Sequence, residues 1–181
     1  MIFEPVMNHF ETRLMGGHPN SLGNTVEIVE EVLADPSSFE ELFNCYFSQD
    51  EVVRLRVSNA MKRICKANKP LLIPYIDKLL QEISQIDQAS TQWTLASLFM
   101  MLEKEMTDDQ IVTAKELMKN NLAHHQDWIV LNTTMETLGN WAKKDIQLKE
   151  WIIPHIQRLS IDSRKSVAGK ARKVIKLFGP V

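Results

Sequence analysis

The sequence predicts an all-α protein built from about four helical hairpins, or roughly nine to ten helices. Nearly every segment places its apolar residues at helical spacing, and the strict alternation typical of β-strands is missing. The connecting segments are short and carry residues that cap or end helices. One helical pattern also recurs at near-constant intervals of 37 to 39 residues, which indicates a repeat architecture.

The first third of the chain contains four expected helices. They cover residues 5–15, 24–34, 38–47 and 50–67. Asn24 and Asp50 are the expected N-caps of the second and fourth helices, and Ser38 with Glu41 has the spacing of a capping box in the third. The glycine-rich segment 16–23 lacks the Lys-Ser/Thr ending of a phosphate-binding loop, so we interpret it as a linker.

Six further helices are expected in the remainder of the chain. They cover residues 71–86, 87–106, 107–122, 127–144, 148–159 and 163–178. Thr107 with Gln110 forms a second capping-box pattern, and Asp127 is an expected N-cap. Turns of only a few residues place neighbouring helices antiparallel, as in helical hairpins.

The internal repeat is clearest in every second helix. Its pattern is Asp50-x-x-Val53-Arg54-x-x-Val57-x-x-Ala60-Met61-x-x-Ile64, and shifts of 38, 77 and 114 residues align it with segments that begin at Gln88, Asp127 and Arg164. The helices that precede them are also similar in sequence, since residues 71–79 align with residues 151–159 and both segments have a proline at the same position. A single hairpin cannot cover its own apolar face, whereas stacked hairpins share a continuous core.

The pattern over residues 50–64 resembles the second helix of a HEAT repeat, which has an Asp, then Val-Arg, then small and apolar residues at these spacings. The later copies are degenerate, because the Val-Arg pair becomes Thr91-Gln92, Val130-Leu131 and Val167-Ala168. The resemblance implies a right-handed α-α superhelix of the HEAT/armadillo-like solenoid class. We expect a single domain over residues 1–181, with N-terminal capping helices (1–47), central repeats (48–162) and a basic C-terminal capping helix (163–181).

In that family the second helices line the concave wall. The positions that point away from the core at 100° per residue, carried through the repeat, include Leu55, Asn59, Lys62, Trp93, Ser97, Met100, Asn132 and Glu136. Polar residues are expected there, yet Leu55, Trp93 and Met100 are apolar. We interpret these as anchors for a protein partner, with burial of Trp93 and Met100 in the core as the alternative.

The net charge of −2 hides a strong asymmetry along the chain. Residues 1–60 carry 3 basic and 10 acidic side chains, whereas residues 141–181 carry 10 basic and 3 acidic ones. The basic patch consists of Arg164, Lys165, Lys170, Arg172, Lys173 and Lys176. Nucleic-acid binding at this end, as in HEAT-like DNA-repair glycosylases, is our second hypothesis, although the balanced overall charge argues against it.

The remaining candidates for chemistry give weak signals. Adjacent His124 and His125 point about 100° apart on a helix and do not form a metal-binding pair. Cys45 and Cys65 are expected to be buried free thiols, and a disulfide between them is the alternative. Trp128, Trp141 and Trp151 are interpreted as core residues. We therefore expect no catalytic residue, no cofactor and no metal.

These observations favour a non-enzymatic interaction module or scaffold that binds a partner peptide or helix on its concave face. Arg54, Arg56 and Lys62 are expected to steer an acidic partner. Two cysteines and no apolar run of membrane-spanning length favour a cytoplasmic protein without a membrane segment. A monomer is favoured over head-to-tail stacking of the oppositely charged ends, and no residue selects the further alternative of a bilin lyase or chaperone.

Overall fold

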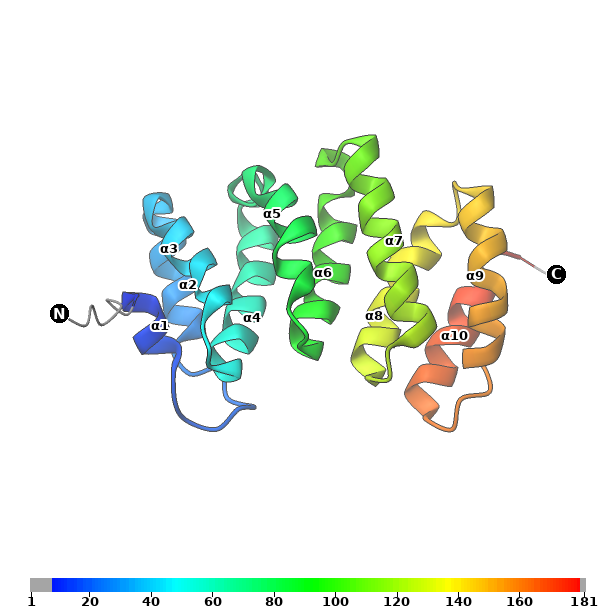
Figure 1. The fold of residues 1–181 in the computed structure, drawn as a ribbon, viewed down its shortest axis with the longest axis horizontal. Helices are drawn as coiled ribbons and strands as arrows, with labels where there is room; N and C mark the ends of the chain where they lie inside the picture. The colour runs from blue at the N-terminus through cyan, green and yellow to red at the C-terminus, as the bar shows by residue number, and fades with distance from the viewer. Residues whose placement is uncertain (1–7, 180–181) are drawn as a thin grey trace. The chain divides into compact units, whose positions relative to one another are not determined.

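The computed structural model describes residues 8–179, and every regular element in this range is helical (Figure 1). The described residues form ten α-helices and six short 3-10 turns, with no β-strand among them. The all-α prediction is therefore confirmed for this part of the chain. The chain divides into two compact units, one ending at Ile76 and one beginning at Asp77, and each is described by itself.

The unit that ends at Ile76, called unit 1, is organised around one long helix. Its helices are α1 (His9–Leu14), α2 (Thr25–Ala34), α3 (Phe39–Asn44) and α4 (Glu51–Ala67). The first three all pack against α4. The carboxylate of Asp50 accepts a hydrogen bond from the backbone N–H of Val52 at 2.8 Å, as expected for an N-cap. Both tyrosines of the chain lie in this unit, packed against Phe43.

Two expected caps in unit 1 are wrong, because the side chains form hydrogen bonds with residues that are distant in the sequence. Asn24 occupies the N-cap position of α2 but makes no capping bond, and its Nδ2 donates to the Arg13 carbonyl at 3.2 Å instead. The Ser38–Glu41 capping box is also absent. Glu41 Oε1 accepts from the backbone N–H of His9 at 3.0 Å, so this carboxylate satisfies an N–H at the start of α1.

The helix expected over residues 71–86 is broken into short pieces. These are 3-10 turns at Lys69–Leu71, Ile73–Tyr75 and Ile83–Gln85, with α5 (Ile76–Gln81) between the last two. Pro70 and Pro74 lie at the starts of the first two turns, where the missing N–H costs least. The equivalent proline of the other copy, Pro154, lies inside a continuous helix, so the proline alone does not dictate the break.

The unit that begins at Asp77, called unit 2, contains five longer helices. They are α6 (Ala89–Leu102), α7 (Asp108–His124), α8 (Trp128–Trp141), α9 (Ile146–Leu159) and α10 (Lys165–Leu177). Helix α8 is the centre of the unit, since it packs against α6, α7, α9 and α10. Both bonds of the Thr107–Gln110 capping box form, and the Asp127 side chain caps α8 as predicted. All four tryptophans of the chain lie in this unit.

The starts of the second helices reproduce the repeat. Helices α4, α6, α8 and α10 begin at Glu51, Ala89, Trp128 and Lys165, at intervals of 38, 39 and 37 residues. These are the intervals at which the sequence pattern recurs.

Within unit 2, α8 approaches its neighbours closely. A Cβ added to Gly139 of α8 would lie 2.7 Å from a methyl group of Val174 in α10. On the other side, the Thr137 hydroxyl donates to the Ala96 carbonyl of α6 at 2.8 Å. Among the described helices, none combines the length and the apolar character needed to cross a lipid bilayer.

Candidate functional site

The predicted partner-binding residues of unit 2 lie on adjoining helices. Trp93, Ser97 and Met100 come from α6, and Asn132 and Glu136 come from α8, which packs directly against it. All five are partly or fully exposed, whereas their helix neighbours Leu95, Leu98 and Leu131 are buried. These five residues, called the second-helix face, therefore form one surface within the unit.

Polar contacts connect this face across the helices. Asn140 of α8, one turn beyond Glu136, places its Nδ2 3.8 Å from the Met100 sulfur of α6. On the other side, Lys170 Nζ of α10 forms an ion pair with Glu136 Oε2 at 2.9 Å. Lys170, a residue of the basic patch, therefore lies at the edge of the second-helix face.

Trp93 and Met100 are both half-buried, so neither of the two sequence interpretations describes them fully. Their side chains contribute to the packing of unit 2 and still present apolar surface beside Ser97. Asn132, one turn before Glu136, has a buried side-chain carbonyl oxygen with no hydrogen-bond partner in the described part of the chain. An unpaired buried acceptor is costly to the fold.

The predicted residues of unit 1 form a separate surface on α4. Leu55, Asn59 and Lys62 are all partly exposed. Asn59 and Lys62 line a hollow of about 400 Å³ together with Arg63 and Lys66. Burial lowers the pKa of Lys62, and the neighbouring charges of Lys66 and Arg63 lower it further.

Arg56 does not have the steering role predicted for it. The side chain is only 2% exposed, and its guanidinium donates to the carbonyls of Leu14, Ser21 and His18. A Cβ at Gly23, where φ is +50°, would lie 3.0 Å from that guanidinium. The glycine-rich segment expected to be a linker is therefore a loop held against α4 by a buried arginine.

The basic patch is partly neutralised. Arg164 is paired with Asp162 at 2.8 Å, Lys170 with Glu136, and Arg172 donates to the Ser160 carbonyl. The hydrogen bond from Arg164 lowers the pKa of the Asp162 carboxyl to about 2. The other three cations, Lys165, Lys173 and Lys176, are exposed and form no salt bridge within residues 8–179.

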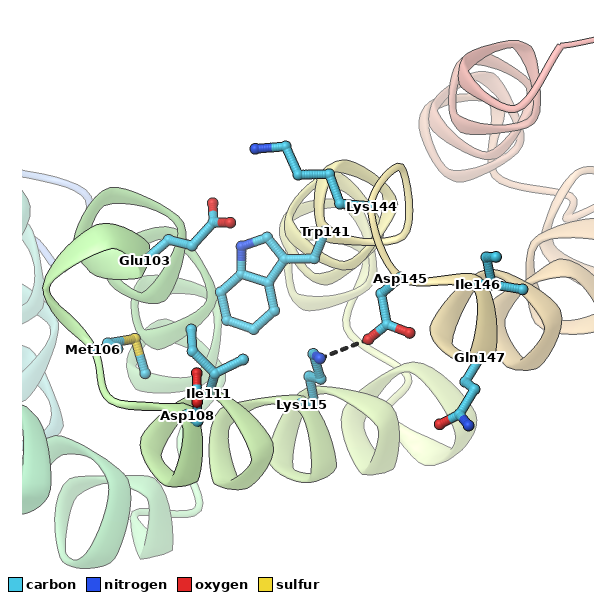
Figure 2. A pocket seen from close by; sticks show the side chains of 10 residues that line it. All are labelled: Glu103, Met106, Asp108, Ile111, Lys115, Trp141, Lys144, Asp145, Ile146 and Gln147. Atoms are coloured by element: carbon cyan, nitrogen blue, oxygen red, sulfur yellow. Dashed lines mark hydrogen bonds and ion pairs between the residues drawn. The ribbon is translucent and has the colours of Figure 1, made fainter.

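A hollow of about 530 Å³ was missed by the sequence analysis (Figure 2). It lies where the segments after α6 and α8 meet the start of α9. Figure 2 shows the Trp141 ring between Glu103 and the α7 residues Ile111 and Lys115. Lys115 Nζ forms an ion pair with Asp145 Oδ2 at 2.6 Å, and Asp145 also caps α9. The hollow is lined by the ends of three helices together with the segments between them, and helical periodicity does not indicate how such ends meet.

The polar groups of this hollow are amines, carboxylates and one amide. Its lining residues include Glu103, Asp108, Lys115, Lys144 and Asp145, but no serine, threonine, cysteine, histidine or tyrosine. The hydrogen bond from Lys115 lowers the pKa of Asp145, which makes this carboxylate a poorer base at neutral pH. The buried Trp141 Nε1 has no hydrogen-bond partner among the described residues.

The other residues considered for chemistry are structural. Cys45 and Cys65 are buried free thiols, as predicted, and burial raises the pKa of both. The His155 ring stacks on the Trp151 ring with the two centroids 4.2 Å apart, and burial lowers the pKa of His155. Trp141 is a core residue as predicted, but Trp128 is 48% exposed, so the core interpretation of Trp128 is wrong. Within residues 8–179, no group of three potential His, Cys, Asp or Glu ligands is placed to hold a metal ion.

Comparison of the chain with protein-family models, with curated proteins and with solved structures gave no significant match in any of the three.

Proposed function

We propose that this protein is a non-enzymatic interaction module of the HEAT/armadillo-like class, and that its second-helix face binds a peptide or helix of a protein partner. The superhelical arrangement of the repeats is part of this proposal. Its support is the recurrence of the sequence pattern together with second helices that begin at the same intervals of 38, 39 and 37 residues.

One observation carries the binding role. Trp93 and Met100 keep apolar surface exposed at one side of α6, next to polar positions on α8, although unit 2 has a well-filled core beneath them. Partly exposed aromatic and methionine side chains beside polar groups are typical of interface anchors. In the hollow near Trp141, by contrast, the Lys115 amine and the Asp145 carboxylate are paired with each other.

Site-specific photo-crosslinking tests this proposal. A photoreactive amino acid at Ser97 lies on the second-helix face, whereas the same amino acid at exposed Thr113 of α7 lies outside it. We expect a defined protein adduct from the native lysate at position 97 and none at position 113. Adducts of equal yield at both positions, or none at either, would contradict the proposal.

A pair of tryptophan variants provides the matched control. Trp93→Ala and Trp128→Ala each remove a partly exposed indole from unit 2, but only Trp93 belongs to the second-helix face. Unlabelled Trp128→Ala protein should compete for the adduct as well as the wild type does, and Trp93→Ala should not. The melting temperature of each variant shows whether a loss of competition comes from unfolding, since Trp93 is also half-buried.

Nucleic-acid binding by the basic C-terminal helix is the second candidate. Exposed Lys165, Lys173 and Lys176 favour it, but the other three cations of the patch already have partners within unit 2. Phosphate contacts are strongest at low salt. A titration with duplex DNA at low ionic strength that shows no binding would exclude this candidate.

A further inference from the structure

A row of cations on α4 is not accounted for by the packing of unit 1. Asn59 and Lys62 are three residues apart, as are Arg63 and Lys66, and the pairs Asn59/Arg63 and Lys62/Lys66 are four apart. The four residues therefore lie along one side of the helix over about 10 Å. They line the hollow of about 400 Å³, and no acidic residue lines it with them. This set of four residues is called the α4 cationic row.

The charges of this row are not neutralised within the described chain. Lys62 and Lys66 form no salt bridge with any residue in 8–179, and Arg63 donates only to the neutral Asn59 side chain, at 2.7 Å. Lys165 and Lys173 of unit 2 also form no salt bridge within residues 8–179, so the distinguishing feature of the row is that its three cations line one hollow. The lowered pKa of Lys62 is the expected result of partial burial beside two like charges.

The helix dipole explains only part of this arrangement. A cation in the last turn offsets the partial negative charge at a helix C-terminus, and Lys66 is such a residue in α4. Lys62 and Arg63 lie a turn earlier, where the effect of the dipole has largely decayed. The dipole therefore does not account for the position of these two cations, and an anion from outside the described chain would relieve their repulsion.

We infer that the α4 cationic row is a binding surface for carboxylates, and that its occupant is a short acidic segment of a protein partner. An oxyanion placed along the row would contact Lys62, Arg63 and Lys66 together, and charge-assisted hydrogen bonds are the stronger kind. Only the source of the segment, a protein partner, rests on the proposed function. The row lies wholly in unit 1 and is distinct from the second-helix face of unit 2.

The charge of the surrounding unit favours a short peptide over a nucleic acid. Residues 1–76 contain 7 basic and 10 acidic side chains, so the positive row lies in a unit of net negative charge. A duplex would bring phosphates against those acidic side chains, with repulsion that extends over roughly 8–10 Å at physiological salt. A short segment contacts the row alone.

Fluorescence anisotropy with defined probes tests the inference. The probes are a short labelled peptide rich in aspartate, its asparagine counterpart and a labelled DNA duplex, with inorganic phosphate as a competitor. The variant is Lys62→Gln/Lys66→Gln. The matched control is Lys165→Gln/Lys173→Gln, which removes two exposed lysines of unit 2 that also form no salt bridge.

We expect the aspartate peptide to bind the wild type and the asparagine peptide not to bind. Loss of two ion pairs should weaken binding of the aspartate peptide roughly fivefold to tenfold in the α4 variant. In the control variant, binding should weaken less than about twofold. The α4 variant should melt close to the wild type, because the removal of mutually repelling charges offsets the loss of the Lys66 charge at the helix C-terminus. The melting temperature of each variant shows whether a loss of binding comes from unfolding.

Four results would overturn the inference. Equal weakening in both variants would mean nonspecific attraction, and no binding of the aspartate peptide at low salt would mean that the row holds no carboxylate. Preferential binding of the duplex, or full displacement by phosphate at a concentration comparable to the peptide's, would assign the row to phosphoryl groups. Crosslinking at Ser97 is unaffected by any of these results, so the two proposals can fail separately.

Discussion

Replacement of Arg56 by methionine tests whether a buried guanidinium holds the glycine-rich loop on unit 1. The side chain donates to three carbonyls, those of Leu14 at 2.5 Å, Ser21 at 3.1 Å and His18 at 3.3 Å. Methionine keeps the apolar part of the side chain, to about the position of Nε, and donates no hydrogen bond. The variant therefore removes the guanidinium with its hydrogen bonds and retains the packing of the aliphatic stem.

The expected cost follows from where the three acceptors lie. The hydrogen bond to Leu14 is buried, and a buried carbonyl left without a donor costs about 1–3 kcal/mol. His18 and Ser21 are exposed, so their carbonyls can bind water and the net loss is roughly 0.5–1.5 kcal/mol each. Allowing for partial relaxation, we expect Arg56→Met to lower the free energy of unfolding by ~3 kcal/mol. Lysine keeps the charge but lacks the planar fork, so Arg56→Lys should cost about half as much.

Urea unfolding followed by far-ultraviolet circular dichroism measures this cost. Arg63→Met on the same helix is the control, because Arg63 is exposed and bonds only to Asn59, and its effect should stay within ~0.5 kcal/mol. Amide exchange gives a local readout, since the Ser21 N–H that donates to the His18 carbonyl should exchange faster in Arg56→Met. A change below about 1 kcal/mol, or one equal to that of Arg63→Met, would refute the argument.

Two further predictions concern unit 2. Gly139→Ala should destabilise unit 2 by about 1–3 kcal/mol, because the new methyl group would lie 2.7 Å from Val174. The control is Gly169→Ala, where the added carbon meets no atom within 4 Å. Thermal melting of the two variants should show a loss of stability for Gly139→Ala alone. Asp145→Asn keeps the capping bond to the Leu148 N–H but loses the Lys115 ion pair. The folded-state pKa of Asp145 is lowered, so its stabilising contribution is present above the usual aspartate value of ~3.9 and is lost as the pH falls through the folded value. The difference in unfolding free energy between wild type and Asp145→Asn should therefore be largest near neutral pH and shrink in acid; a difference that grows in acid would contradict the assignment.

The features predictable from the sequence are those decided within a few residues. The caps at Asp50, Thr107 and Asp127 formed because each side chain reaches an N–H two or three residues ahead. Repeat spacing likewise placed the second helices, since apolar periodicity is a local property of the chain. The same periodicity identified exposed positions such as Ser97 and Glu136 on the adjoining helices α6 and α8.

The features that could not be predicted depend on distant partners. Glu41 had the correct spacing for a capping box, but its carboxylate accepts a hydrogen bond from the N–H of His9, 32 residues away. Arg56 looked like an exposed cation because its partners lie 35 to 42 residues earlier in the chain, at the end of α1 and in the loop that follows it. No local pattern encodes the position of that loop. The α4 cationic row was visible as a spacing of lysines, but the absence of acidic neighbours around it required coordinates.

The aromatic residues are divided between the units in a way that gives each its own optical reporter. Both tyrosines, Tyr46 and Tyr75, belong to unit 1, and the four tryptophans, Trp93, Trp128, Trp141 and Trp151, all belong to unit 2. Selective excitation of indole therefore follows the melting of one half of the molecule, while second-derivative absorbance of the phenols follows the other. Melting of the unlabelled wild-type chain, followed by both signals, therefore shows whether units 1 and 2 unfold together or one after the other.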